Sequence, residues 1–142
     1  MTDMVSLTKL RRIATPKGAV LHCLKATDAG FAGFGEAYFS VVLAAETKGW
    51  KKHNRMTLNL AVPSGAVRFV VRASKPPHGI VVDAVLSPDS DETYQRLTVP
   101  PGFWVAFRGV GAGESIVVNI ASIPHDPQEA DVLDLSAFPI PD

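Results

Sequence analysis

The chain has 142 residues, the size of one domain, and its 14 lysines and arginines balance its 14 aspartates and glutamates. This zero net charge argues against a protein that binds nucleic acid through a broad basic surface. The single cysteine excludes an internal disulfide and a cysteine-based zinc site. No apolar run reaches the ~20 residues of a membrane span. The N-terminal residues lack the order of a signal peptide, so we expect a cytoplasmic protein.

The charges are unevenly distributed along the chain. Residues 1–82 hold twelve basic and four acidic residues, whereas residues 83–142 hold two basic and ten acidic residues. One explanation is that the two segments pair with each other in the fold. The other is that the first segment contains a local basic site for an anionic ligand.

Short segments of alternating apolar and polar residues predict β-strands. The predicted strands cover residues 19–26, 37–44, 56–62, 67–72, 80–86, 94–99, 104–110 and 115–122. Clusters rich in Pro, Gly and Ser separate most of them and mark turns. The tail holds at most one helical turn, around residues 134–138. Eight short strands at this spacing predict an all-β sandwich, jelly roll or barrel.

Several predicted strands have one apolar face and one mixed face, as a two-layered β domain requires. The apolar faces carry Leu58, Leu60 and Val62, then Val67, Phe69 and Val71, then Phe103, Val105 and Phe107.

The densest chemistry lies in residues 48–55, which read KGWKKHNR and hold four of the fourteen basic residues together with His53. Such a segment is either a solvated basic loop or the cationic mouth of a site for a phosphate-bearing ligand. In the second interpretation His53 is the group that transfers a proton.

The chain resembles the cupins around this segment. Their first motif, G-x5-H-x-H-x4-E-x6-G, aligns with Lys51 at the first histidine, His53 at the second and Leu58 at the glutamate. Their second motif, P-x-G-x-x-H, aligns with residues 100–105, where Val105 replaces the histidine. One remaining histidine will not hold a divalent metal. The resemblance therefore implies an all-β cupin jelly-roll barrel with neither a metal nor another cofactor.

Among cupins without a metal, the chain is similar to the dTDP-4-dehydrorhamnose 3,5-epimerase family and to the sugar-nucleotide 3,4-ketoisomerases. The similarity covers residues 34–131, with its clearest signals at His53 and in the turn Pro-Pro-Gly-Phe at 100–103. It implies one cupin domain over 1–142, with a core at about 19–122 and a C-terminal extension at 123–142.

The resemblance also implies an isomerase that acts on a nucleoside-diphosphate 4-keto-6-deoxyhexose, in deoxysugar supply for surface polysaccharide such as lipopolysaccharide. A histidine removes a proton next to the keto group, an enolate forms, and a proton returns on the other face or at another carbon. We expect His53 to be the base and Lys51 to stabilise the enolate oxygen. The expected substrate-binding residues are Lys48, Lys52, Arg55 and Arg68 for the diphosphate, with Tyr38, Asn59, Asn119, Trp104 and His125.

The chain departs from both families at their catalytic positions. The epimerases carry a tyrosine acid where this chain has Ile123, and Lys51 replaces the first ketoisomerase histidine. The alternative hypothesis is therefore a non-catalytic cupin that binds a sugar nucleotide. His125 either replaces the missing tyrosine or is a turn residue capped by Asp126. Trp104 either stacks on the ligand or covers the outer sheet or a dimer contact. A homodimer is expected, because related cupins pair through sheet surfaces and N-terminal strands.

Overall fold

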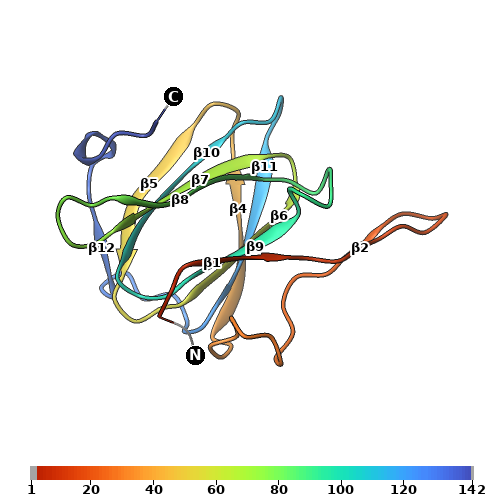
Figure 1. The fold of residues 1–142 in the computed structure, drawn as a ribbon, viewed down its shortest axis with the longest axis horizontal. Helices are drawn as coiled ribbons and strands as arrows, with labels where there is room; N and C mark the ends of the chain where they lie inside the picture. Colours follow the sequence, from red (N-terminus) through yellow and green to blue (C-terminus); the bar gives the residue numbers. More distant parts are fainter. Residues whose placement is uncertain (1–2, 142) are drawn as a thin grey trace.

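The computed structural model describes residues 3–141 and consists mainly of two five-stranded antiparallel sheets that face each other (Figure 1). One sheet has the strand order β1-β9-β6-β11-β4, and the other has the order β12-β5-β10-β7-β8. This arrangement confirms the predicted all-β jelly roll. The strands are β1 (Ser6–Lys9), β2 (Arg12–Ile13), β3 (Val20–Leu21), β4 (Glu36–Val42), β5 (Thr47–His53), β6 (Leu58–Ser64), β7 (Val67–Ala73), β8 (Ile80–Leu86), β9 (Gln95–Val99), β10 (Phe103–Gly109), β11 (Ser115–Ala121) and β12 (Ala130–Val132).

The core lies between the two sheets and is built from the predicted apolar faces. The side chains of β6, β7 and β10 that were expected on one face all contribute to it, with Phe103 and Phe107 partly buried at its border. The opposite faces of these strands point away from this core and are largely covered by other segments of the chain, such as the C-terminal residues over Val70, Trp104 and Ala106. Alternation along each strand therefore predicted correctly which side chains point inward.

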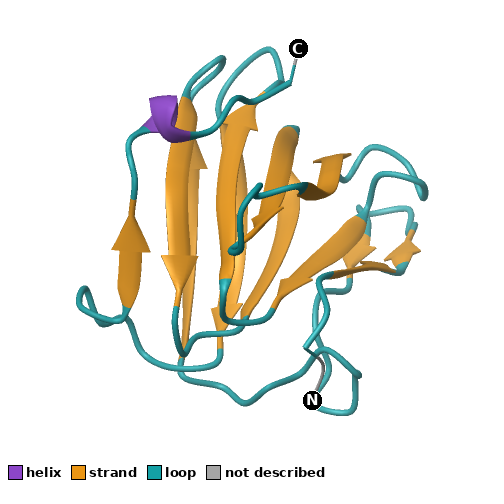
Figure 2. Cartoon of the chain, turned by 60° about the vertical axis from the view of Figure 1, so that its left-hand side comes forward, coloured by secondary structure: helices purple, strands orange, loops and turns teal. Residues whose placement is uncertain are grey.

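Two predictions about elements were wrong. Most of the basic segment 48–55 belongs to strand β5, although its alternation is masked by glycine and consecutive lysines. The predicted strand at 19–26 is reduced to β3, which pairs with β2 in a hairpin that projects from the body (Figure 1). The predicted helical turn in the tail is a 3-10 helix, η1 (Leu135–Ala137), which follows the edge strand β12 (Figure 2).

The uneven charges of the chain pair across the fold. Four ion pairs join a cation from residues 1–82 to a carboxylate from residues 83–142, as the first explanation predicted. These pairs are Arg12–Asp91, Lys52–Asp131, Arg55–Asp126 and Arg68–Asp83. Most of them are well exposed, so each contributes little to stability. Between residues 3 and 141, no helix has the length and apolar character needed to cross a bilayer.

Candidate active site

A cavity of about 390 Å³ opens between the two sheets, beside strands β4, β5 and β11. Its apolar wall comes from core side chains, and its polar groups come mainly from β4, β5 and β11. The lining residues are Tyr38, Ser40, Lys48, Gly49, Trp50, Lys51, His53, Leu58, Leu60, Val105, Phe107, Val117, Asn119 and Val132. Five of the residues predicted from the sequence are therefore brought together here: His53, Lys51, Lys48, Tyr38 and Asn119.

A bulge in β5 explains how Lys48 and Lys51 both come to line the cavity. These two residues lie three positions apart, so a regular strand would send them to opposite faces. The pairing with β10 shifts at this point, because Gly49 and Trp50 together stand opposite Ala106. Because the bulge adds one residue to β5, Lys51 points to the same side of the strand as Lys48. Gly49 is required there, since its φ is +145° and an added Cβ would lie 2.5 Å from the Ala106 side chain.

His53 is held by a buried carboxylate from the C-terminal extension. Its Nδ1 contacts Oε1 of Glu129, whose side chain is 1% exposed. The other oxygen of that carboxylate accepts three backbone N–H groups, from Asn54 at 3.1 Å, Arg55 at 2.9 Å and Met56 at 3.2 Å. The turn that follows β5 thus forms a cradle of amides around one anionic oxygen.

The environment of Glu129 favours its ionised form. Burial raises the pKa of this carboxyl, but hydrogen bonds from His53 and from the backbone amides of Arg55 and Met56 outweigh it. The net result is a pKa below the ordinary value. An ionised Glu129 accepts a hydrogen bond from Nδ1–H of His53. The lone pair of the imidazole is then on Nε2, which is the nitrogen available for proton transfer.

Tyr38 and Asn119 form a second polar group in the cavity. They stand opposite each other on the paired strands β4 and β11, and Asn119 Nδ2 donates a hydrogen bond of 2.9 Å to Tyr38 Oη. The Asn119 carbonyl oxygen accepts the backbone N–H of Asn59 at 3.0 Å, which orients the amide. The only other contact of the phenol hydroxyl within residues 3–141 is a weak one with Met56 Sδ at 3.9 Å.

The structure places two other predicted cations outside the cavity. Lys52 lies between Lys51 and His53 and faces the outer surface, where it pairs with Asp131 and sits over the Trp104 ring. Arg68 also lies on the outer face and pairs with Asp83. Neither residue lines the cavity.

The remaining predicted residues have other surroundings. Arg55 is exposed and pairs with Asp126. Asn59 is buried in a network with Thr98 and the Gly30 carbonyl. Trp104 packs on the outer face against the chain's own C-terminal residues, which agrees with the interpretation that it covers the sheet. His125 is exposed, and its backbone N–H is bonded to Glu36.

Sequence reasoning missed Glu129 and Ser40. Glu129 lies in an acidic tail, 76 positions from His53, and no local motif marks it. Ser40 could have been found from the alternation of β4, because it shares a face with Tyr38. Within residues 3–141 no cluster of three or more histidine, cysteine or acidic residues is arranged to hold a metal ion.

Solved structures show what this fold is similar to. A dTDP sugar isomerase from Desulfovibrio desulfuricans G20 is 32% identical, with a TM-score of 0.84, and the match covers 94% of this chain and 85% of that one. The chain belongs to the RmlC-like cupin family. A dTDP-4-dehydrorhamnose 3,5-epimerase from Sulfolobus tokodaii shares the cupin fold at 20% identity and a TM-score of 0.79, over 97% of this chain and 81% of that one.

The same cupin fold occurs in QdtA, a sugar 3,4-ketoisomerase from Thermoanaerobacterium thermosaccharolyticum solved in complex with TDP. That match has 19% identity and a TM-score of 0.70, over 92% of this chain and 89% of that one. No family model matches the sequence of this cupin, and a search of curated proteins found no match. Family membership was thus expected from the sequence motifs, and the structural comparison confirms it.

Proposed function

We propose that this cupin is a sugar-nucleotide epimerase or ketoisomerase that acts on a nucleoside-diphosphate 4-keto-6-deoxyhexose by proton transfer. The observation that carries the proposal is the buried His53–Glu129 pair beside a cavity lined by Lys48 and Lys51, neither of which has a carboxylate partner within residues 3–141. The relative that is 32% identical is a dTDP sugar isomerase, and QdtA was solved in complex with TDP. These names support the substrate class proposed for this chain.

His53 acts as the base in this mechanism. Glu129 accepts the hydrogen of Nδ1 and holds the imidazole in one tautomer, so Nε2 carries the lone pair. Nε2 then removes a proton from a carbon next to the keto group. The 4-keto group makes this proton acidic, because the resulting charge is delocalised onto oxygen as an enolate. The ionised Glu129 also stabilises the imidazolium that forms.

Lys51 and Tyr38 complete the proton transfer. Lys51 lines the cavity and has no carboxylate partner within residues 3–141, so its charge is available to the enolate oxygen. Tyr38 supplies the proton that returns to carbon, in place of the family tyrosine that is absent at Ile123. The hydrogen bond from Asn119 occupies a lone pair of the phenol oxygen. The phenol's own hydrogen points to Met56 Sδ at 3.9 Å, a weak acceptor from which it can turn to the substrate.

Lys48 binds the diphosphate in this proposal. It lies at the rim of the cavity, where its Nζ donates to the Val41 carbonyl at 2.8 Å, and an ammonium has further hydrogens for phosphate oxygens. The proposal also includes a cytoplasmic location and a role in supplying deoxysugars for lipopolysaccharide or a related surface polysaccharide.

A homodimer is part of the same proposal, with β4 as its contact strand. This strand is an edge of its sheet, and it exposes Phe39 (69%) and Val41 (47%) on its outer face, with the exposed Leu43 (57%) directly after its end. A free edge with apolar side chains is a template for pairing with an identical strand. A second copy of this chain would cover both the backbone groups and the apolar side chains of β4, so we propose that copy as the binding partner.

Solvent exchange tests the catalytic proposal. Incubation with dTDP-4-keto-6-deoxyglucose in deuterium oxide should incorporate deuterium at carbons next to the keto group, as measured by NMR of the sugar. The variant His53→Ala should abolish incorporation. Lys52→Ala is the matched control, because it alters the adjacent residue on the opposite face of β5 and should exchange at the wild-type rate.

The second candidate, a cupin that binds a sugar nucleotide without catalysis, is supported by the absence of the family tyrosine at Ile123. Calorimetric binding of dTDP with no deuterium incorporation would favour this candidate. If dTDP does not bind at all, both candidates are wrong.

A further inference from the structure

The C-terminal extension supplies two parts of the candidate active site. Glu129 contacts His53, and Val132 lines the cavity. Glu129 directly precedes β12 and Val132 lies in it. Among the strands of residues 3–141, this three-residue strand pairs only with β5. Its ladder places Ala130 opposite His53. Glu129 is also held by the turn after β5, because its carbonyl accepts Asn54 N–H at 3.0 Å and Asn54 Nδ2–H at 2.9 Å and its carboxylate accepts backbone amides. The position of this carboxylate therefore depends on these contacts together with how firmly the short edge strand is held.

The contacts of β12 itself are few. Beyond its ladder, the backbone of Leu133 exchanges two hydrogen bonds with Trp50, of 3.0 and 3.1 Å. The side chain of Asp131 forms an exposed ion pair with Lys52 at 3.4 Å. Exposed pairs of this kind hold a strand weakly, and a strand of this length is easily displaced from an edge.

The residues after β12 are held far more extensively, on the outer face of the same sheet. Phe138 packs on a cluster of Trp50, Trp104, Val70 and Ala106. Its ring centroid lies 5.3 Å from that of Trp50 and 5.9 Å from that of Trp104. We call this cluster the tryptophan cradle; because it consists of outward-facing residues, the tail that covers it is what keeps it from solvent.

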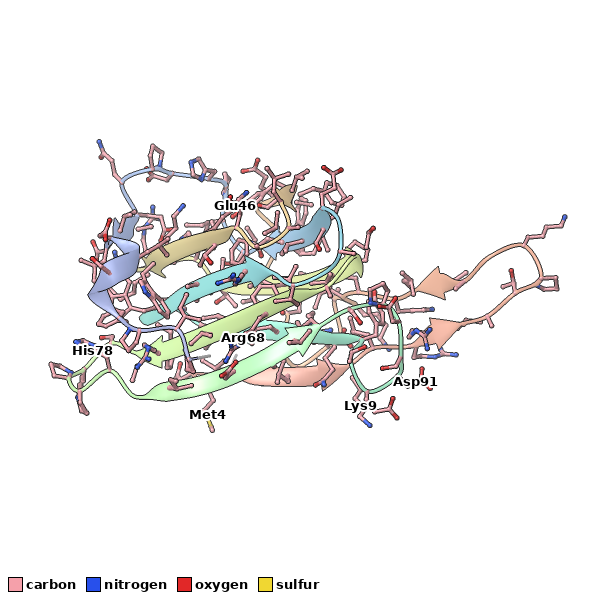
Figure 3. The ribbon with its side chains drawn as sticks, turned by 90° about the horizontal axis from the view of Figure 1, so that it is seen from above. Met4, Lys9, Glu46, Arg68, His78 and Asp91 are labelled. Atoms are coloured by element: carbon pink, nitrogen blue, oxygen red, sulfur yellow. The ribbon has the colours of Figure 1, made fainter. Side chains whose placement is uncertain are left out.

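Polar contacts fasten the same stretch of backbone. The Phe138 carbonyl accepts Trp50 Nε1–H at 3.3 Å, and the Pro139 carbonyl accepts Arg72 Nη2–H at 2.6 Å. Arg72 also lies 5.9 Å from the Phe138 ring centroid, within the range of a cation–π contact. The His78 ring centroid lies 4.7 Å from that of Phe138, with the two rings tilted by 46°. Figure 3 shows the C-terminal end passing beside His78.

We propose that Phe138 is a positioning residue for the active site: its insertion into the tryptophan cradle clamps β12 against β5 and so holds Glu129 on His53. The 3-10 turn η1 links the clamp to the strand, and its start is capped by Asp134, which accepts Ser136 N–H. Phe138 does not line the cavity, so it acts on the reaction through the residues that it holds, which are Glu129 by way of β12 and the cavity-lining Trp50. The catalytic part of this inference rests on the function proposed above, whereas the structural part does not.

The test uses the full chain with Phe138→Ala. The only two tryptophans of the protein both lie in the cradle, so their fluorescence reports docking of the tail directly. NMR of protein labelled with ¹⁵N at histidine reports the Nδ1–H of His53, which a buried carboxylate protects from solvent exchange. Phe138→Ala should shift tryptophan emission to longer wavelength and cause loss of the His53 Nδ1–H signal. Deuterium incorporation should become about tenfold slower, with dTDP affinity unchanged.

Two further variants make the comparison decisive. Leu135→Ala alters an exposed residue of the same tail that is not part of the buried cradle cluster, and it should match the wild type in every measurement. Phe138→Tyr keeps the ring and should restore the Nδ1–H signal. If the alanine variant fails to fold, Phe138→Leu serves in its place, with smaller changes in the same direction.

The outcomes separate this inference from the proposed function. Red-shifted emission with an intact Nδ1–H signal would show that the tail can undock without disturbing Glu129, and would overturn the inference. Unchanged emission would overturn it as well, because Phe138 would not be the clamp. If the wild type exchanges no deuterium but Phe138→Ala still removes the Nδ1–H signal, the proposed function fails and the clamp stands.

Discussion

Replacing Glu129 by glutamine tests the His53–Glu129 pair with almost no change in shape. The carboxylate accepts one hydrogen bond from His53 and three from backbone amides. The amide oxygen of glutamine can keep the backbone contacts, but its NH₂ group then faces Nδ1 of His53. Since that group is a donor, Nδ1 must become the acceptor, and the proton moves to Nε2. The nitrogen that should remove the substrate proton is then blocked.

The size of the effect follows from these contacts. Reversal of the tautomer should slow deuterium exchange about 10²–10⁴-fold, the range found when such an orienting carboxylate is removed. Hydrogen bonds to a charged acceptor contribute about 1 kcal/mol more than neutral ones, so three weakened backbone contacts cost roughly 3 kcal/mol of stability. Urea denaturation measures this second quantity.

The control for Glu129→Gln is Asp131→Asn, on the same short strand. It removes a charge from an exposed ion pair with Lys52 and leaves the cavity unchanged. Exchange should stay at the wild-type rate, and stability should fall by less than about 1 kcal/mol. If Glu129→Gln exchanges within about threefold of the wild type, far short of what a reversed tautomer requires, Glu129 does not set the tautomer of His53, and the proposed base is wrong.

Three other predictions concern binding, stability and assembly. Lys48→Ala should weaken dTDP binding about tenfold in calorimetry, the loss of one charged hydrogen bond to the diphosphate, while Lys52→Ala should leave the affinity unchanged. Equal effects of the two variants would place the ligand elsewhere. The pKa of Glu129 is below its ordinary 4.5 in the fold, so its ionisation stabilises the protein above pH 4.5, and this contribution is lost as the pH falls through the folded-state pKa. The free energy of unfolding in urea should therefore fall more between pH 6 and pH 3 for the wild type than for Glu129→Gln. Equal losses in the two proteins would contradict the assignment. Phe39→Asp should convert a dimer to a monomer in sedimentation equilibrium, and a variant that stays dimeric would exclude β4 as the contact strand.

The sequence predicted the two-layered architecture because a β-sheet with one buried face imposes a period of two on its residues. Leu58 and Leu60, for example, appear as core residues from alternation alone, and both line the cavity. The same rule failed at residues 48–55, since a bulge at Gly49 interrupts the alternation of β5. A bulge depends on the partner strand, so its position cannot be read from one strand by itself.

The active-site base could be named from the sequence, but its partner could not. His53 was singled out because it stands in a cupin motif beside Lys51 and is the right group for proton transfer near neutral pH. Glu129 reaches it from 76 positions away, through a strand that was not predicted. A three-residue edge strand forms only when its neighbour and its anchoring contacts are already in place.

The zero net charge excluded a broad basic surface, and alternation, turn residues and the cupin motifs determined an all-β jelly roll with His53 at its basic segment. These are local properties, because side-chain direction and turn formation depend on a few adjacent residues. Tertiary structure alone decided which cations meet a carboxylate. Lys52, Arg55 and Arg68 pair with carboxylates from the acidic half of the chain, while Lys48 and Lys51 line the cavity and have no carboxylate partner among residues 3–141. An ion pair depends on the distance between two charges in the folded structure and not on their separation along the chain. Glu129, which orients His53, could not be identified from the sequence for the same reason.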